Sequence, residues 1–329
     1  MNYAIDKSNL RQVIIDYPNQ LQAGAEFAKN IQIEMKKKPS NLIICGMGGS
    51  ALPGDFLIAY LREIKKKLPV FISQDYSLPP ETTENSLVFI SSYSGNTEET
   101  LACFKEALEK KLPIVAFSES GEVEKIAKEN KIPHVKYKIN YKNFQPRYAI
   151  SYAMVAMNKV LTNLGISDRI TILPKIDSLS TENYGKKLAR KAKNKIPIIY
   201  ASDKFGFLAK TWKIKINENA KIPAFWNVFP ALSHNEMVSF SKPPHRYCVF
   251  MLKGPQDHPR IQKRMDLTAD LYRDRGIEVE IIEIKGITFL EKVLNTFILG
   301  DWLSYYLAIE NGQDPTPVDL VEELKLKLK

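Results

Sequence analysis

Short apolar segments alternate with amphipathic ones along this chain, and this alternation restricts the possible folds most strongly. The apolar segments are NLIICG (41–46), PVFIS (69–73), SLVFIS (86–91), PIVAFS (113–118) and HVKYKI (134–139). Segments of helix length lie between several of them, the clearest at residues 50–67 and 96–111. The second of these places its apolar side chains at spacings of three and four, which predicts one buried helix face. Apolar strands that alternate with helices are typical of a parallel sheet covered on both faces.

The pattern then repeats. Further strands are expected at residues 196–202, 246–252 and 279–284, and further helices at 207–221, 258–276 and 289–312. Helices at 18–37 and 150–163 would begin and close the first series, with a linker at 168–178. A chain of 329 residues has the length of about two domains. We therefore expect an α/β protein of two flavodoxin-like units, with domains at 1–163 and 164–312 and a C-terminal helix at 313–329.

Composition excludes several classes of protein. The formal net charge is +10, but the lysines are spread along the chain and no aromatic-interleaved basic segment accompanies them, so nucleic acid is not expected as a partner. Such a surface would instead attract small anionic substrates. The sequence contains no apolar run of membrane-spanning length and no signal-peptide layout, which predicts a cytoplasmic protein with no membrane partner. The cysteines and histidines lack metal-ligand spacing, and we expect buried free thiols, no metal and no cofactor.

Two loops follow expected strands and open expected helices. The first, GMGGS (46–50), combines glycines with a helix start, an arrangement that exposes backbone N–H groups to an anion. Its spacing fits neither a dinucleotide fingerprint nor a Walker motif, so a plain strand–helix turn is an equal alternative. The second, SSYSGNTEET (91–100), is rich in hydroxyl groups. Asn96 or Thr97 could cap the helix, but capping explains one hydroxyl and not four. Neutral donors at the carboxyl ends of strands suit a phosphate monoester.

The two loops resemble the phosphate-binding loops of SIS (sugar isomerase) domains. Together with segments 146–153, 217–237 and 314–325, they make the chain similar to the bifunctional phosphoglucose/phosphomannose isomerase family of archaea and bacteria. Members of that family have two SIS domains in each chain. The resemblance implies an isomerase that interconverts glucose 6-phosphate, and mannose 6-phosphate too, with fructose 6-phosphate. It also implies a homodimer with active sites at domain and subunit interfaces.

The resemblance also implies a role for individual residues. The phosphate-binding positions match Gly49, Ser50, Ser92, Ser94 and Thr97. Arg147 matches the arginine beside C1 and C2 of the sugar, and Glu218 matches the catalytic base. His234 matches the histidine of ring opening, which the partner subunit would supply, and Lys325 matches a C-terminal lysine that returns to the active site, with Lys327 as its alternative. The residues after Arg147 are larger than the family pattern, which bears on the shape of the sugar pocket.

The chemistry of aldose–ketose isomerisation requires these residue types. Ring opening moves a proton near neutral pH, for which histidine is suited. One carboxylate can carry the proton between C2 and C1 through a cis-enediolate, and a fixed cation stabilises the new negative charge.

Alternatives remain open on the residues alone. Glu218, Arg147 and His234 each fit a solvated surface position, and Glu236 is a second candidate base. A non-catalytic SIS protein that senses a phosphosugar is the main alternative function. An aminosugar synthase would need an N-terminal cysteine nucleophile, which Met1-Asn2 does not provide. The apolar segment 293–309 is long enough to form a dimer interface.

Overall fold

The computed structural model describes residues 3–35, 37–141, 143–168, 170, 176–243 and 246–328. Most of the linker expected at 168–178 therefore lies outside the described residues. The chain divides into two compact units. The first unit is Tyr17–Lys175, and the second unit combines Met1–Asp16 with Ile176–Lys329. The domain boundaries expected after residues 163 and 312 stay a prediction.

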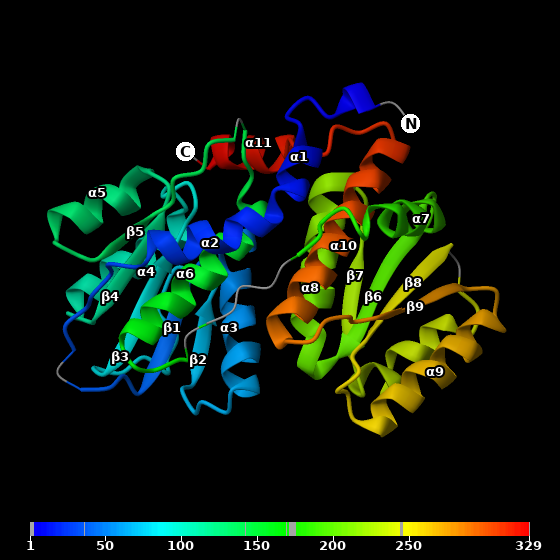
Figure 1. Ribbon diagram of the computed structural model, residues 1–329, viewed down its shortest axis with the longest axis horizontal. Helices are drawn as coiled ribbons and strands as arrows, with labels where there is room; N and C mark the ends of the chain where they lie inside the picture. The colour runs from blue at the N-terminus through cyan, green and yellow to red at the C-terminus, as the bar shows by residue number, and fades with distance from the viewer. Residues whose placement is uncertain are drawn as a thin grey trace. The chain divides into compact units, whose positions relative to one another are not determined.

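The first unit is built on a parallel sheet with the order β2-β1-β3-β4-β5 (Figure 1). Its strands are β1 (Asn41–Cys45), β2 (Val70–Ser73), β3 (Ser86–Ser91), β4 (Ile114–Ser118) and β5 (His134–Lys136). Its helices are α2 (Tyr17–Phe27), α3 (Leu52–Glu63), α4 (Glu98–Glu109), α5 (Gly121–Glu129) and α6 (Ile150–Asn163). Every residue of β1, β3 and β4 is buried, as expected of strands that helices cover on both faces. This strand order is that of flavodoxin-like folds.

The second unit contains another parallel sheet, with the order β7-β6-β8-β9 (Figure 1). Its strands are β6 (Ile196–Ser202), β7 (Phe225–Phe229), β8 (Tyr247–Lys253) and β9 (Glu278–Glu283). Its helices are α1 (Leu10–Ile15), α7 (Glu182–Ala192), α8 (Gly206–Lys215), α9 (Pro259–Arg273), α10 (Phe289–Glu310) and α11 (Asp319–Lys327). Arg11 of α1 forms a bidentate pair with Glu182 of α7, with both N–O distances at 2.8 Å. This contact attaches the N-terminal residues to the second unit.

Several expectations need correction. The first helix ends at Phe27, ten residues short of the expected end at residue 37. The structure also contains elements that the sequence did not predict, namely β7, α1, α5 and α7. The apolar segment 293–309, considered as a dimer interface, lies in α10 and is buried inside the second unit. There it packs against α7, α8 and the turn after α8, so its apolar length builds the monomer core. The three cysteines are buried free thiols, as expected.

Candidate functional site

The two candidate phosphate loops leave neighbouring strands of the first unit. β1 and β3 pair directly, and each ends in one of the loops. From β1 the chain goes to β2 on one side, whereas β3 leads to β4 on the other, so the loops flank a topological switch point. Ligands of open parallel sheets bind at such points, outside the carboxyl ends of the strands.

Hydrogen bonds tie the two loops together. The Ser91 hydroxyl donates to the Ser50 carbonyl oxygen at 3.0 Å, and the Ser50 hydroxyl accepts from the Tyr93 N–H at 3.2 Å. Gly46 packs so closely that a Cβ there would lie 2.8 Å from the Ser91 carbonyl oxygen. The first loop therefore needs glycine because the second loop occupies the side-chain space.

The serine-rich loop is held by its own hydroxyl groups. Ser92 Oγ and Thr97 Oγ1 share a hydrogen bond of 2.9 Å, and Ser92 Oγ also accepts from the Gly95 N–H at 3.1 Å. Ser94 Oγ accepts from the Asn96 N–H at 3.3 Å. Gly95 has a φ of +72°, a left-handed conformation that favours glycine. These bonds hold the hydroxyl groups of Ser92, Ser94 and Thr97 within one turn.

Side-chain capping of α4, the alternative role considered for Asn96 and Thr97, is not found among the described residues. Thr97 occupies the N-cap position, but within the described residues no side chain caps the helix, and the Thr97 hydroxyl bonds Ser92 instead. The Asn96 side chain accepts from the Glu122 N–H at 3.0 Å, which is in the first turn of α5. The first N–H groups of α4 are therefore available to an anion at the positive end of the helix dipole.

Arg147 lies beside the first loop. A Cβ on Gly49 would come within 2.8 Å of the Arg147 backbone nitrogen, so the two backbones are in direct contact. The Arg147 side chain is 1% exposed, its Nη1 donates to Gln145 Oε1 at 3.4 Å, and its guanidinium lies 5.4 Å from the Tyr148 ring centre. The structure thus gathers Arg147 and the predicted phosphate-binding residues at one edge of the first sheet. Tyr148, the larger residue that follows the arginine, thus packs its ring near the guanidinium.

Glu218, His234 and Lys325 belong to the second unit. Glu218 is half-buried in a π-helical turn, Ile216–Ala220, that continues α8. The Lys221 ammonium donates to the Glu218 carbonyl oxygen at 3.0 Å, and Asn219 Nδ2 donates to Ser304 Oγ at 2.8 Å. π-helical turns are often found at functional sites, because they displace side chains from the regular helical register.

A buried ion pair lies directly before this turn. Lys215 Nζ is 2.5 Å from Asp301 Oδ1, and both side chains are 0% exposed. The pair joins the end of α8 to the middle of α10, so it fixes the helix from which the turn with Glu218 begins.

Glu236, the second candidate base, has a structural role. Its Oε1 accepts from the Tyr200 hydroxyl at 2.5 Å, and its Oε2 accepts from Asn227 Nδ2. Both oxygens are thus bonded to residues of β6 and β7. Burial and the Glu236 carboxylate raise the pKa of Tyr200, which keeps this hydroxyl a donor. Glu218 is therefore the better candidate for a base.

Glu218 and His234 lie before and after the same strand. Glu218 precedes β7, whereas exposed His234 ends the short helix Ala231–His234 that follows it. The strand between them has five residues, which span roughly 13–17 Å. Lys325, on exposed α11, pairs with Glu322 of the same helix at 2.6 Å.

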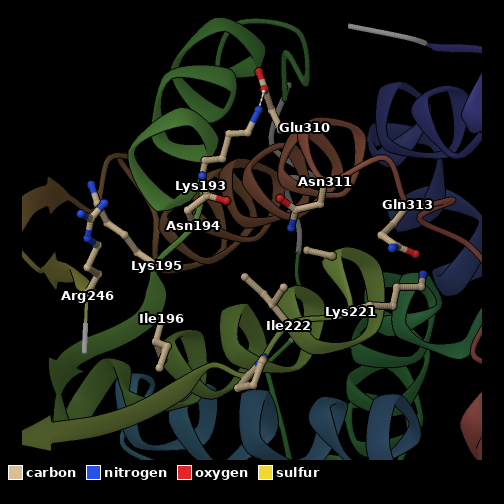
Figure 2. Close-up of a pocket in the computed structure, with 12 residues that line it drawn as sticks. Lys193, Asn194, Lys195, Ile196, Lys221, Ile222, Arg246, Glu310, Asn311 and Gln313 are labelled. Atoms are coloured by element: carbon tan, nitrogen blue, oxygen red, sulfur yellow. Dashed lines mark hydrogen bonds and ion pairs between the residues drawn. The ribbon is translucent and has the colours of Figure 1, made fainter. Parts of the chain in front are cut away.

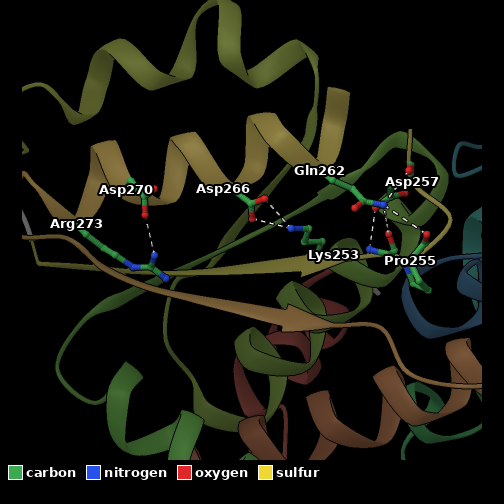
Figure 3. A network of polar contacts seen from close by, with 8 residues as sticks. Lys253, Pro255, Asp257, Gln262, Asp266, Asp270 and Arg273 are labelled. Atoms are coloured by element: carbon green, nitrogen blue, oxygen red, sulfur yellow. Dashed lines mark hydrogen bonds and ion pairs between the residues drawn. The ribbon is translucent and has the colours of Figure 1, made fainter. Parts of the chain in front are cut away.

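In the second unit, an acidic side chain lies at the loops that correspond to the two candidate phosphate loops; Figure 3 shows it, Asp257, among its polar contacts. Strands β6 and β8 hold the sheet positions of β1 and β3, and the Asp257 carboxylate hydrogen-bonds the loops after both. Its Oδ1 accepts from the Ser202 hydroxyl at 2.6 Å, and its Oδ2 accepts from the Gly254 N–H at 2.8 Å. Gln262 Nε2 donates to the Asp257 carbonyl oxygen at 3.0 Å. Burial raises the pKa of Asp257, despite these donors.

The described residues contain no group of three or more His, Cys, Asp or Glu side chains arranged to hold a metal ion. Within the same residues, no helix has both the length and the apolarity needed to cross a membrane.

Family models match both halves of the chain. Residues 34–158 match the SIS domain, and residues 181–328 match the "Bacterial phospho-glucose isomerase C-terminal SIS domain". Among solved structures, the C-terminal domain of glucosamine-fructose-6-phosphate aminotransferase from Francisella tularensis is similar, with a TM-score of 0.73, 14% identity and coverage of 94% of this chain and 98% of that one. Tagatose-6-phosphate ketose/aldose isomerase from Escherichia coli has a TM-score of 0.65 at 14% identity, with 93% of each chain covered. These likenesses show the fold.

Three relatives are closer in sequence. The bifunctional phosphoglucose/phosphomannose isomerase of Caldicellulosiruptor bescii is 35% identical over 96% of this chain and 97% of its own. The enzyme of the same name from Aquifex aeolicus is 33% identical over 88% and 90%. A D-glucosamine-6-phosphate 4-epimerase from Sulfolobus acidocaldarius is 30% identical over 62% and 65%. The chain, with its two SIS domains, belongs to the bifunctional phosphoglucose/phosphomannose isomerase family.

Proposed function

We propose that this protein isomerises glucose 6-phosphate and mannose 6-phosphate to fructose 6-phosphate and back. The observation that carries the proposal is the joined pair of loops at the switch point of the first sheet, in a chain whose full-length relatives are named as bifunctional isomerases. Both aldoses give the same enediolate, because the configuration at C2 is lost when the proton leaves. One base can therefore serve both substrates.

The phosphate is held by Gly49, Ser50, Ser92, Ser94 and Thr97. Backbone N–H groups of the first turn of α4 and the hydroxyl groups of the serine-rich loop donate to its oxygens. This site uses neutral donors, which suits a ligand that must leave after each turnover. Buried Arg147 lies against Gly49 and would hold the negative charge that develops on O1 and O2 of the enediolate.

Glu218 acts as the base in this mechanism. Its carboxylate takes the C2 proton of the open-chain aldose as a double bond forms between C1 and C2 and the electron pair of the C1 carbonyl moves onto O1. A proton then passes from O2 to O1, and Glu218 returns its proton to C1 as the C2 carbonyl of the ketose forms. The same steps in reverse regenerate either aldose. A positioned general base contributes about 10²–10⁴-fold to the rate. Lys325 would complete the site from α11, with Lys327 as the alternative.

Ring opening is assigned to His234 of a second copy of the chain. Base and ring-opening group must reach adjacent atoms of one hexose, whereas Glu218 and His234 of one chain lie before and after β7. The exposed side chains of Leu320, Leu324 and Leu326 on α11 support an interface between copies. The proposal therefore includes a homodimer, and it places the enzyme in the cytoplasm.

A coupled assay with Glu218→Gln tests the function. Purified protein is given fructose 6-phosphate in the presence of EDTA, and glucose 6-phosphate and mannose 6-phosphate are measured. The wild type should form both, and the variant should lose about 10²–10⁴-fold in kcat because the amide cannot accept the proton. Glu109→Gln, an exposed position on α4, is the matched control and should keep full activity.

The assay also separates the alternatives. A wild type that binds fructose 6-phosphate but forms neither aldose would be a sensor, and the proposal would be wrong. A wild type that changes glucosamine 6-phosphate at C4 and leaves fructose 6-phosphate unchanged would have the activity named for the Sulfolobus acidocaldarius relative. NMR of the product mixture distinguishes these results directly.

A further inference from the structure

A basic pocket lies in the second unit, on residues that none of the proposed catalytic steps uses. It has a volume of about 760 Å³, a size that holds a drug-sized ligand. Figure 2 shows its lining, which comes from the residues around Asn194 before β6, the segment 220–223, Arg246 and the segment after α10. It shares no described residue with the two phosphate loops of the first unit.

The charges of the lining favour an anion. The basic residues are Lys193, Lys195, Lys221 and Arg246, whereas Glu310 is the acid among the lining residues. Glu310 Oε2 pairs with Lys193 Nζ at 3.0 Å, and Lys195 Nζ pairs with the carboxylate of Glu278, which is not part of the lining. Two of the four basic residues therefore already have an acidic partner, and the lining as a whole keeps an excess of positive charge. Figure 2 shows Lys195 and Arg246 at one end of the pocket and Lys221 at the other. An anion with several charges could contact both ends.

The remaining lining adds neutral contacts. Asn194, Asn311 and Gln313 offer amide donors and acceptors, and Ile222 and Pro223 form an apolar wall. Basic side chains can bind a polyphosphate, and an apolar wall can contact a ring that is joined to it. A phosphate without a ring would contact only the basic side chains. A nucleoside triphosphate combines both features.

Lys221 connects this pocket to Glu218. Its ammonium lies in the pocket lining and donates to the carbonyl oxygens of Glu218 at 3.0 Å, Asn219 at 3.1 Å and Asp314 at 2.6 Å. Lys221 also has a left-handed backbone, with φ at +55°, and ends the π-helical turn. A bound polyanion would attract the ammonium away from the turn that holds Glu218.

We propose that this pocket binds a polyphosphate-bearing anion, in the manner of a nucleoside triphosphate, and that binding lowers kcat through Lys221. The binding part stands on the pocket alone. The effect on kcat rests on the proposed function, because it requires Glu218 to be the base. Since the pocket and the phosphate loops share no described residue, the inhibition should leave the KM for fructose 6-phosphate unchanged.

Calorimetric titration tests the site. ATP is added to the full chain with EDTA present and with saturating fructose 6-phosphate, which blocks the phosphate loops. The wild type should bind ATP, and Arg246→Glu should weaken binding at least tenfold because it reverses a charge at one end of the pocket. Arg260→Glu, an exposed arginine on α9 outside the lining, is the matched control and should bind as the wild type does. Tripolyphosphate should bind more weakly than ATP, because it lacks the ring.

Each result decides part of the proposal. An undetectable heat with millimolar ATP, or equal affinity in the wild type and Arg246→Glu, would overturn the site. Equal affinity for ATP and tripolyphosphate would overturn the role of the apolar wall. If ATP binds an active enzyme without lowering kcat, the coupling through Lys221 is wrong. If the enzyme is inactive with every sugar phosphate, the proposed function fails, while the titration still decides the site.

Discussion

Gly49 shows how a single residue can join two parts of a site. It lies in the candidate phosphate loop after β1, and its α-carbon faces the backbone of Pro146 and Arg147. The atoms that a Cβ would meet belong to backbone, which cannot rotate away as a side chain can. The phosphate loop and the buried guanidinium therefore keep their relative positions only while this residue is glycine.

We predict that Gly49→Ala displaces the Arg147 guanidinium from the candidate phosphate loop and thereby lowers catalytic efficiency. The new Cβ would lie 2.8 Å from the Arg147 nitrogen and from the Pro146 carbonyl carbon, so the segment with Arg147 must shift. A displaced hydrogen-bond donor to a charged group costs about 1.5–3 kcal/mol, and kcat/KM for fructose 6-phosphate should therefore fall by about 10–100-fold. Steady-state kinetics measure this loss.

Gly54→Ala is the control for that substitution. Gly54 follows in α3, and its Cβ would meet only side-chain atoms of Ile72 and Ile44, the nearest at 3.0 Å. These side chains can move by a few tenths of an ångström, and alanine favours the helix. Full activity in Gly54→Ala with reduced activity in Gly49→Ala is expected, and equal kinetics in both would contradict the role of the backbone contact.

At the scale of an element, the π-helical turn after α8 positions Glu218. The ion pair between Lys215 and Asp301 precedes the turn, and Asn219 bonds Ser304 across to α10. Two polar contacts thus tie the turn to the most buried helix of the second unit. Removing two charges from water costs free energy, so the pair adds little to the net stability of the fold. Its main effect is to fix the position of α8 against α10.

Asp301→Asn should destabilise the protein strongly. The change leaves the buried Lys215 ammonium without its carboxylate, and breaking a buried ion pair costs about 3–5 kcal/mol. The free energy of unfolding, measured in urea, should fall by that amount. The double variant Lys215→Met with Asp301→Leu removes both charges and should regain most of the loss. A double variant as unstable as Asp301→Asn would contradict this account.

The elements differ in how far the sequence could predict them. The positions of the two loops after β1 and β3 were predictable because glycines and hydroxyl residues directly follow buried strands, a local pattern. Their role in binding phosphate stays a prediction. The role of Asn96 was not, because it bonds Glu122 of another helix. Likewise, no local pattern pairs Lys215 with Asp301, which is far along the chain. Strand β7 was missed because it begins with the exposed residues Phe225 and Trp226 and therefore lacks the buried apolar pattern of the other strands.

At the scale of the whole molecule, the sheets of the two units have their first four strands in the same order, but the loops at their switch points differ. The first unit carries the predicted phosphate-binding residues at its switch point, whereas in the second unit the Asp257 carboxylate hydrogen-bonds both matching loops. The organisation into two parallel α/β units was predictable from the repeated alternation of strands and helices. The division of roles was not, since it depends on which side chain enters the loop.

Each unit also contains a buried titratable group, and the two groups change the stability of the fold with pH in opposite directions. Burial lowers the pKa of His134, on β5 of the first unit, more than the Glu124 carboxylate raises it. Burial raises the pKa of Asp257 in the second unit. The folded protein thus disfavours charged His134 and charged Asp257. The histidine weakens the fold as the pH falls, and the aspartate weakens it as the pH rises through the acidic range.

His134 should dominate the response between pH 7.5 and pH 5. The unfolded chain takes up a proton on this histidine near its ordinary pKa of about 6.5, whereas the folded chain takes it up only at lower pH. The unfolding free energy should therefore fall as the pH drops through 6.5 and level off below the folded-state pKa. His134→Gln keeps an amide that can bond Ser118, whose hydroxyl lies 2.8 Å from the ring Nε2 in the wild type. Urea unfolding midpoints across this range should fall less in the variant, and an equal fall in both proteins would show that His134 is not the group responsible.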